Sequence, residues 1–457
     1  MTARRIFGVE TEYGITCATT DGTTMTADDA ARLLFRSVIA RGLSSNVFLR
    51  NGARLYLDVG SHPEYATAEC DDVHHLVVQD RAGERILDEL TEQANAHLAA
   101  DGVAGTVHLF KNNLDSAGNS FGCHENYLVR RRRDFRDMAE ALVPFFVTRQ
   151  VLTGAGHVRR TAAGRPAFAF SQRADQMWDA LSSATTRSRP IINTRDEPHA
   201  DAELYRRMHV IVGDSSVAET TTMLKVGATD LLLGMLEAGV KVRDLALAEP
   251  MRAIREISHD ATGTEPVELA DGRRVSATDV QEDLLTRVLD FVSTETDLTP
   301  VQRQVLDLWE RGIQALRTQD PTGVSTELDW AVKAGLLERY RAKHNLGLDD
   351  PRVSRLLLAY HDISPTRGLA TTMAERGLLA RITTDEEVAE ATTVPPQTTR
   401  AKLRGDFVGA AQDRRRDITV DWVHLKINDA NQRTVMCKDP FAAVDQRVED
   451  LMAALDA

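Results

Sequence analysis

Alternating apolar and polar residues, the pattern of a half-buried strand, collect in the first half of the chain. They predict strands over residues 5–16, 54–59, 106–112, 126–129 and 206–212. The separation is sharpest in 54–59, where one face is apolar and the other is polar. The apolar face carries Leu55, Leu57 and Val59, and the polar face carries Arg54, Tyr56 and Asp58.

Helical spacing of apolar residues dominates the second half of the chain and also occurs earlier. It predicts helices over residues 27–41, 74–100, 138–153, 219–238, 300–319, 325–344 and 400–414. In 27–41 we expect Ala31, Leu34, Val38 and Ile39 on one buried side. Pro144 should start, end or kink a helix, because proline cannot donate the backbone hydrogen bond.

Strands therefore precede helices along the chain, which favours an α+β fold over alternating βαβ units. A polar turn with adjacent prolines at 392–399 indicates a boundary, and a strand is predicted beyond it over 419–427. We expect one large domain, residues 1–390, and a small C-terminal domain, residues 391–457.

The composition is that of a soluble globular protein, with 457 residues, 42% hydrophobic and 27% charged. A net charge of −13 argues against a general nucleic-acid binder, although it leaves room for a local basic groove. We expect no nucleic-acid partner.

Four cysteines lie far apart and form no C-x-x-C pair, so neither disulfides nor a zinc site is expected. No signal peptide and no membrane-spanning run is evident, which favours the cytoplasm and no membrane partner.

Carboxylates gather on the polar faces of the first two predicted strands. Glu10 and Glu12 share one face, Asp58 lies on the other strand, and Glu64 follows shortly after. Paired carboxylates repel each other unless a counter-charge is present, and Mg²⁺ with its oxygen ligands supplies one. Arg54 beside them suits a phosphate. A half-exposed sheet with a solvated outer face explains the same alternation, and spacing alone does not decide between the two.

Two further polar clusters have both a functional and a structural interpretation. Residues 111–127 contain glycines beside His124, which fits either close approach to a ligand or a simple hairpin loop. Residues 182–199 hold arginines that could bind phosphate or an acidic peptide, or could form a solvated loop. Arg207 and His209 share a strand face, where a lone histidine is more often structural. The chain has no P-loop and no G-x-G-x-x-G.

Long stretches of the chain resemble the Pup ligase family, the family of proteasome accessory factor A (PafA). The matching stretches are residues 8–14, 45–69, 111–127, 182–201, 421–426 and 434–441. The resemblance implies a fold similar to glutamine synthetase and the carboxylate–amine ligases: a curved antiparallel sheet cradle packed with helices, plus a small C-terminal domain. It implies joining of the C-terminal glutamate side chain of Pup, an acidic disordered protein, to a lysine of a target through a γ-glutamyl phosphate. The target is thereby marked for proteasomal degradation.

Residue roles follow from the same resemblance, position by position. It implies ATP and Mg²⁺ as cofactors, with Glu10, Tyr56 and Glu64 at the metal. It places Arg54, Thr67 and Trp422 on ATP and makes Asp58 the catalytic base. Glu12 and His124 become further metal or phosphate neighbours, and Arg195 and Arg207 weaker phosphate candidates. An acidic Pup requires a basic groove, for which the candidates are residues 130–133, Arg187, Arg189, Arg206, Lys402 and Arg404.

Three alternatives remain open. The sister depupylase and deamidase family (Dop) shares the fold, but it carries a long insertion where residues 13–50 alone separate Glu12 from Asn51 here. Its first strand also tends toward E-V-E, where this chain has E-T-E. A small-molecule ligase of the glutamate–cysteine type would need no Pup. A non-catalytic scaffold would have lost a carboxylate of the metal set, and all are present.

Overall fold

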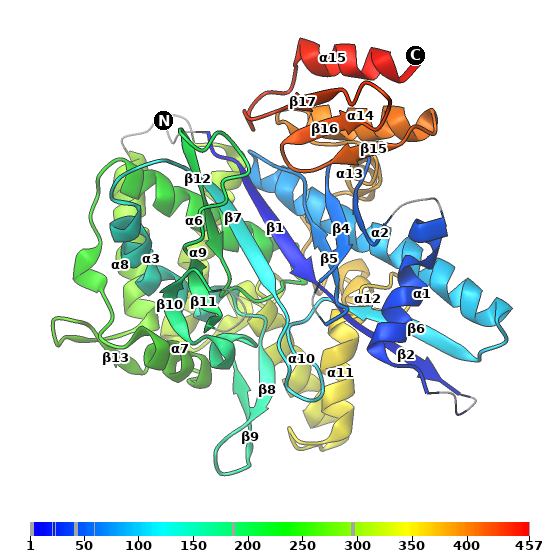
Figure 1. The fold of residues 1–457 in the computed structure, drawn as a ribbon. Coiled ribbons are helices and arrows are strands. Elements are labelled where there is room, and N and C mark those ends of the chain that lie inside the picture. Colours follow the sequence, from blue (N-terminus) through cyan, green and yellow to red (C-terminus); the bar gives the residue numbers. More distant parts are fainter. Residues whose placement is uncertain are drawn as a thin grey trace.

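The computed structural model describes residues 4–20, 22, 24–40, 44–58, 60–184, 188–293 and 298–456. An eight-stranded sheet runs through its centre (Figure 1). All pairings in it are antiparallel except that between the first two strands of this order. The order is β10 (Asp179–Ser182), β11 (Pro190–Asn193), β12 (Tyr205–Val210), β7 (Cys123–Arg130), β1 (Phe7–Glu12), β5 (Pro63–Ala66), β4 (Arg54–Leu57) and β3 (Asn46–Phe48).

The segment predicted as one strand, residues 5–16, is two strands that belong to different sheets. β1 ends at Glu12, and β2 (Gly14–Thr19) pairs instead with β6 (Gly105–Phe110). The buried Tyr13 lies at the change of partner, where its backbone NH donates to the carbonyl of Pro63. Two short hairpins, β8 (His157–Arg160) with β9 (Pro166–Ala169) and β13 (Pro266–Glu268) with β14 (Arg274–Ser276), complete this part.

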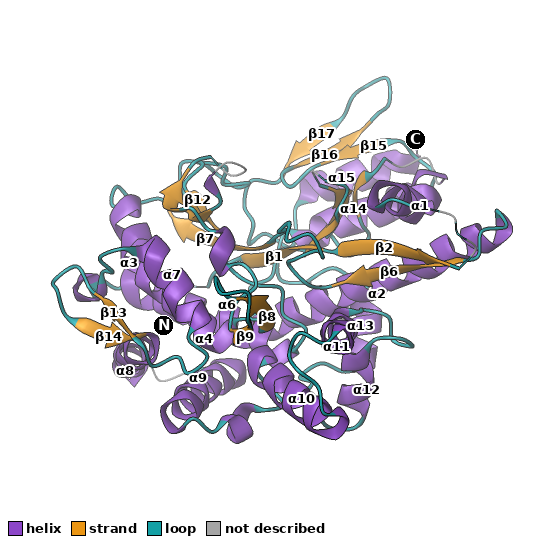
Figure 2. Ribbon diagram, turned by 90° about the horizontal axis from the view of Figure 1, so that it is seen from below, coloured by secondary structure: helices purple, strands orange, loops and turns teal. Residues whose placement is uncertain are grey.

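Helices pack against one face of the central sheet, with α6, α9 and α10 together on that side (Figure 2). The core there joins Phe7 and Val9 of β1 to Leu231 of α6 and Trp309 of α9, all buried. The helices before the C-terminal region are α1 (Ala27–Ala40), α2 (Val73–Ala100), α3 (Phe135–Thr148), α4 (Gln150–Thr153), α6 (Glu219–Glu237), α7 (Pro250–His259), α8 (Ala277–Ser293), α9 (Pro300–Thr318), α10 (Asp329–His344), α11 (Pro351–His361), α12 (Leu369–Glu375) and α13 (Asp385–Ala391).

Most predicted helices are confirmed, with three local corrections. Ile39, expected on the buried side of α1, is 52% exposed, because it lies at the C-terminal end of the helix. Pro144 neither starts nor ends a helix, since it lies inside α3 and the break follows at Arg149. The helix predicted over 325–344 begins only at Asp329, because the residues before it include the short 3-10 turn Pro321–Val324.

The C-terminal region contains α14 (Ala401–Asp413), a three-stranded sheet of β15 (Ile418–Val420), β16 (His424–Ile427) and β17 (Thr434–Met436), and α15 (Gln446–Ala453). It has a hydrophobic cluster of its own, built around Phe407, Leu425 and Leu451. The strand predicted over 419–427 is a hairpin, because Asp421 accepts hydrogen bonds from the backbone NH groups of Val423 and His424 and turns the chain. In Figure 1 this region lies beside the β4–β5 end of the large sheet.

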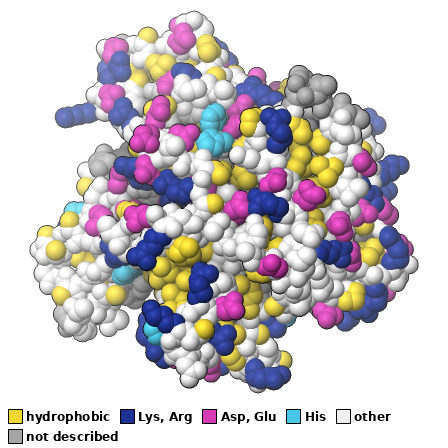
Figure 3. Space-filling view, turned by 180° about the vertical axis from the view of Figure 1, so that it is seen from behind, with side chains coloured by type: hydrophobic (Ala, Val, Ile, Leu, Met, Phe, Trp, Pro, Cys, Tyr) yellow, Lys and Arg dark blue, Asp and Glu magenta, His cyan; other side chains and the backbone are white. Residues whose placement is uncertain are grey.

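The α+β class and the antiparallel-rich sheet covered by helices are thus confirmed. No helix in the described ranges combines the length and apolar content needed to cross a membrane. Acidic and basic side chains are interspersed over the face opposite that of Figure 1, so this face carries no large block of one charge (Figure 3).

Candidate active site

The sheet face opposite the helical core is polar, and strand register assembles its residues. On β1, Val9 and Thr11 turn toward the helices, which leaves Glu10 and Glu12 on the polar face. Glu10 stands opposite His124 of β7, and Glu12 stands opposite Glu64 of β5. Tyr56 of β4 in turn stands opposite Glu64. The pairing of β4, β5, β1 and β7 therefore places the predicted metal residues next to one another on this face.

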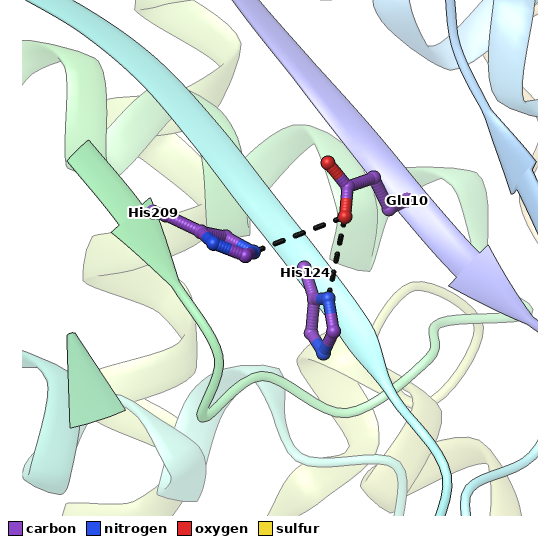
Figure 4. Close-up of side chains that lie close together, drawn as sticks. All are labelled: Glu10, His124 and His209. Carbon is purple, nitrogen blue, oxygen red and sulfur yellow. Dashed lines mark hydrogen bonds and ion pairs between the residues drawn. The ribbon is translucent and has the colours of Figure 1, made fainter. Parts of the chain in front are cut away.

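One group of ligand-type side chains consists of Glu10, His124 and His209 (Figure 4). The Nδ1 atom of His124 lies 3.3 Å from one Glu10 oxygen, and Nε2 of His209 lies 3.8 Å from the same oxygen. Burial would raise the pKa of Glu10, but the hydrogen bond with His124 and the charge of Arg207 help hold it well below its usual value. Burial lowers the pKa of His209 to about 3, so its ring is neutral near pH 7.

A second group consists of Glu12, Asp58 and Glu64, whose carboxylate oxygens lie within 4.8 Å of one another. Burial, together with the charges of Glu10 and Glu12, raises the pKa of Glu64 well above its usual value. Tyr56 hydrogen-bonds with Glu64, and burial and the nearby carboxylates raise the pKa of its phenol. In the described part of the chain, no lysine or arginine forms an ion pair with Glu12 or Glu64. A divalent cation near Glu12 and Glu64 would supply positive charge to these two carboxylates.

That Glu10, Tyr56 and Glu64 are magnesium-site residues stays a prediction, and the geometry adds detail to it. Glu10 and Glu64 fall into the two separate groups, and His124 lies between them. Its Nε2 atom is 4.0 Å from Glu12, while its Nδ1 faces Glu10. Gly122 makes this approach possible, because a Cβ atom there would lie 2.6 Å from an oxygen of Glu12 and would also collide with His124.

Arg54 leaves the same face of β4 as Tyr56 and stacks on its ring, 4.2 Å from guanidinium carbon to ring centre. Its Nε atom donates to the Asn46 side chain at 2.9 Å. Within the described residues the two terminal nitrogens of Arg54 make no hydrogen bond. The side chain is held at its Nε atom, and its two terminal nitrogens are available to an acceptor such as a phosphate oxygen.

A pocket beside the first group contains the other two predicted nucleotide residues. Thr67 and Trp422 both line it, together with Gly8, Glu10, Asn126 and His199. The hydroxyl of Thr67 accepts a hydrogen bond from the backbone NH of Val9, which fixes it beside Gly8. Trp422 meets Phe48 edge-on at 5.0 Å between ring centres. The pocket thus lies between the sheet and the C-terminal region.

Arg207 and Arg195, the weaker phosphate candidates, differ in position. Arg207 lines the pocket, donates to the Asn126 side chain at 2.7 Å and lies 3.6 Å from Glu10. Arg195 is half exposed and faces Glu197. Only Arg207 joins the site.

Most candidates for a basic groove already have acidic or aromatic neighbours. Arg131 pairs with Asp196, Arg132 with Asp134 and Lys402 with Asp406, and Arg206 stacks on Phe135. Arg189 donates to Gln176, and Arg130 and Arg133 are exposed or nearly so. Arg404, another candidate for this groove, cannot line an open surface, because it is buried and pairs with the buried Glu69. Arg187, like Val59 of the predicted strand, lies outside the described residues.

His209, which the sequence favoured as structural, and His199, which it placed in a polar loop, both lie at the site. A histidine on a strand is ordinary, and only the register with β7 places His209 5.1 Å from His124, ring centre to ring centre. Among the described residues neither ring nitrogen of His209 has a hydrogen-bond partner, which is unusual for a buried imidazole.

Comparison with known proteins gives one consistent family. The sequence profile of the Pup-ligase protein family matches residues 5–426. The Pup–protein ligases of Sanguibacter keddieii and Xylanimonas cellulosilytica are each 64% identical over 456 residues, covering 100% and 99% of this chain and all of each relative.

Solved structures agree with that result. A crystal structure of the complex between Pup and its ligase PafA matches with a TM-score of 0.94 and 43% identity, covering 99% of this chain and 91% of that one. A structure of PafA with ADP matches with a TM-score of 0.86 and 44% identity, covering 96% of each chain. A bifunctional glutathione synthetase from Pasteurella multocida, 10% identical with a TM-score of 0.50, shares the fold alone. The chain belongs to the Pup ligase family.

Proposed function

We propose that this Pup ligase uses ATP and Mg²⁺ to join the C-terminal glutamate side chain of Pup to a lysine of a target protein. The observation that carries the proposal is the meeting, on one sheet face, of a three-carboxylate group with an arginine and a pocket lined by Thr67 and Trp422. The ligase relatives and the ADP-bound structure support it. We take the two-domain division at residues 390 and 391 as part of the proposal.

The residues present fit a hard divalent cation. Glu12, Asp58 and Glu64 offer oxygen ligands, which Mg²⁺ prefers, and burial together with the charges of Glu10 and Glu12 raises the pKa of Glu64. We assign Tyr56, Glu64 and Glu10 to this metal region, with Glu12 and Asp58 beside them. When bound, Mg²⁺ neutralises phosphate and carboxylate oxygens and so stabilises charge that develops during transfer.

The nucleotide is assigned to the pocket beside Glu10. Trp422 offers an aromatic face for a base, Thr67 a hydroxyl, and Arg54 the free ends of a guanidinium for phosphate. Gly8 leaves room on this side of the pocket, since a Cβ atom there would lie 3.2 Å from the Thr67 hydroxyl. The purine would then lie toward the C-terminal region and the phosphates toward the carboxylates.

Activation of the carboxylate explains the need for ATP. A carboxylate is a poor electrophile, because its oxygen is a very poor leaving group. Transfer of the terminal phosphoryl group to the Pup glutamate gives a γ-glutamyl phosphate, from which phosphate leaves readily. Arg54 counters the negative charge of this step.

Attack by lysine raises a protonation problem that Asp58 addresses. With a pKa of about 10.4, only about one lysine in a thousand is neutral near pH 7.4, a cost of roughly 4 kcal/mol. Desolvation at the site lowers the lysine pKa, and the Asp58 carboxylate accepts the proton as the amide bond forms. Asp58 follows directly after β4, beside Glu12 and Glu64, where the activated glutamate would lie.

Partners and location extend the same proposal. The structure of PafA with Pup supports Pup as partner, and lysine-bearing proteins are the targets. The described residues include all four cysteines, and no disulfide joins them, in keeping with the cytoplasm.

The test is a reconstituted reaction with ATP, Mg²⁺, Pup ending in glutamate and a lysine-bearing target. We expect a target band larger by the mass of one Pup, dependent on all four components. Pup ending in glutamine serves as the control substrate. Its conversion to glutamate, without a ligated product from glutamate-ended Pup, would identify a depupylase instead. ATP consumption with free glutamate and no Pup would identify a small-molecule ligase.

A further inference from the structure

A buried carboxylate joins the large sheet to the C-terminal region directly behind the nucleotide pocket. Glu69, just beyond β5, is 9% exposed, and it lies between Arg400 and Arg404, which are 2% and 1% exposed. Arg400 donates to one Glu69 oxygen at 2.7 Å, and Arg404 donates to both oxygens. Burial would raise the pKa of Glu69, but the charges of Arg404 and Arg400 outweigh it and hold the value at about 2.

Arg404 extends from this carboxylate to the residues that shape the pocket. Its Nε atom donates to the carbonyl of Gly52 at 2.9 Å, in the turn before β4, and its Nη1 atom donates to the carbonyl of Trp422 at 3.3 Å. Its guanidinium carbon also lies 4.8 Å from the centre of the Trp422 ring and 5.2 Å from that of Phe48. Arg404 therefore fixes both the backbone and the ring of Trp422.

Arg400 fixes the neighbouring wall. Its Nη2 atom donates to the carbonyl of His199, and its Nη1 atom donates to that of Cys437, each at 2.8 Å. His199 and Arg400 both line the pocket with Trp422. The carboxylate of Glu69 thus orients two guanidinium groups that hold neighbouring parts of one pocket.

Stability alone does not explain such an arrangement. Burying one carboxylate and two guanidinium groups carries a large desolvation penalty for each ion, and apolar side chains of similar volume often stabilise an interface as well or better. Arginine offers what they cannot, namely planar donors of fixed geometry and a face that stacks on aromatic rings. The two arginines therefore hold the residues of the pocket wall in a precise position.

We propose that Glu69 and Arg404 are positioning residues for nucleotide binding, acting through Trp422. Glu69 orients Arg404, and Arg404 holds the Trp422 ring in the position that receives the nucleotide. The inference rests on the proposed function, since it requires that the pocket lined by Trp422 holds ATP.

The test uses Arg404→Lys, which keeps a positive charge near Glu69 but loses the stacking and the bidentate donors. We expect the dissociation constant for ADP with Mg²⁺, measured by calorimetry on the full chain, to rise about tenfold. Trp422→Ala should raise it by a similar factor. In the Trp422→Ala background, Arg404→Lys should change the dissociation constant for ADP by less than about twofold. The reason is that Arg404 acts through the Trp422 ring, which this background lacks. In ligation assays Arg404→Lys should raise KM for ATP and leave KM for Pup unchanged.

Arg149→Lys is the matched control for a merely structural role. Arg149 is equally buried, pairs with the buried Glu125 and stacks on Phe146, but it lies on the helical side of the sheet. It should lower stability toward urea as Arg404→Lys does, without the change in ADP affinity.

Two results would overturn the inference while leaving the proposed nucleotide position intact. One is an unchanged ADP affinity in Arg404→Lys, and the other is an equal effect with and without Trp422. If Trp422→Ala itself leaves ADP binding intact, the proposed nucleotide position fails, and the inference fails with it. Failure of the positioning role alone would instead leave Trp422→Ala weakened and Arg404→Lys normal.

Discussion

The guanidinium of Arg54 stacks on the ring of Tyr56, because the two side chains leave the same face of β4 two residues apart. The stack on Tyr56 and the hydrogen bond from Nε to the Asn46 side chain together hold the guanidinium in place. The proposed phosphate contact and a proposed metal residue are therefore mechanically connected.

Replacing Arg54 by lysine should impair the use of ATP. Lysine keeps the charge but loses the stack on Tyr56 and the forked donors that match phosphate, so KM for ATP should rise about tenfold or more. The measurement is the steady-state rate of ligation at varied ATP. The control is Arg36→Lys, because Arg36 is an exposed arginine on α1 that pairs with Asp101 away from the site. This variant should behave as wild type. A normal KM for ATP in Arg54→Lys would remove Arg54 from the nucleotide site.

Replacing Asp58 by asparagine should separate binding from catalysis. Asparagine has nearly the same shape but cannot accept the lysine proton, so the ligation rate should fall by about 10²–10⁴. The dissociation constant for ADP should stay within about twofold of wild type, since the nucleotide pocket is lined by other residues. Both are measured on the same preparation. A wild-type ligation rate with normal ADP binding would show that Asp58 is not the base.

Replacing Gly122 by alanine should disturb the carboxylates without unfolding the chain. The added methyl group would lie 2.6 Å from an oxygen of Glu12 and against His124, so one of these side chains must move. Ligation should slow by at least about tenfold, because small displacements of catalytic groups are costly. Gly323→Ala, where a Cβ atom meets nothing within 4 Å, is the control. The ligation rates of the two variants are compared after their melting temperatures have shown that both are folded. A wild-type rate in Gly122→Ala would show that Glu12 and His124 tolerate displacement.

The fold was predictable as far as local periodicity determines it. Alternation identified β4 and the polar face of β1, and helical spacing identified α2 and α6. The change of sheet at Tyr13 was not predictable, because alternation continues through it. That change depends on the Pro63 carbonyl and on β6, both far along the chain.

The site was predictable only within single strands. Spacing places Glu10 and Glu12 on one face, but it gives no information on which histidines of later strands lie beside them. His209 and His124 meet through the register of β12 with β7. Arg404 fits a solvated helix face by its local sequence, yet its partner Glu69 is 335 residues away and buried. Long-range pairing of this kind is set by tertiary packing and leaves no local pattern.

Asp88 on α2 offers a prediction of pH-dependent stability away from the site. Burial, with the charge of Glu92, raises its pKa to about 6, despite the nearby Arg367. Because the folded state holds this proton more tightly than the unfolded state, stability falls as the pH rises from 3.8 to about 6 and stays reduced above that range. Asp88→Asn removes the effect, since asparagine never ionises.

The shift corresponds to about 3 kcal/mol, and partial solvent exposure reduces the expected gain for Asp88→Asn to about 1–2 kcal/mol at pH 7.5. Urea unfolding at pH 7.5 and 4.5 measures it, and the gain should shrink at the lower pH, where Asp88 of the wild-type protein is largely protonated when folded. Glu310→Gln removes an exposed carboxylate from α9, away from Asp88, and is the control, with no gain expected. A gain for Asp88→Asn that is equal at both pH values would mean that it comes from helix propensity or a new hydrogen bond, and not from relief of a buried charge.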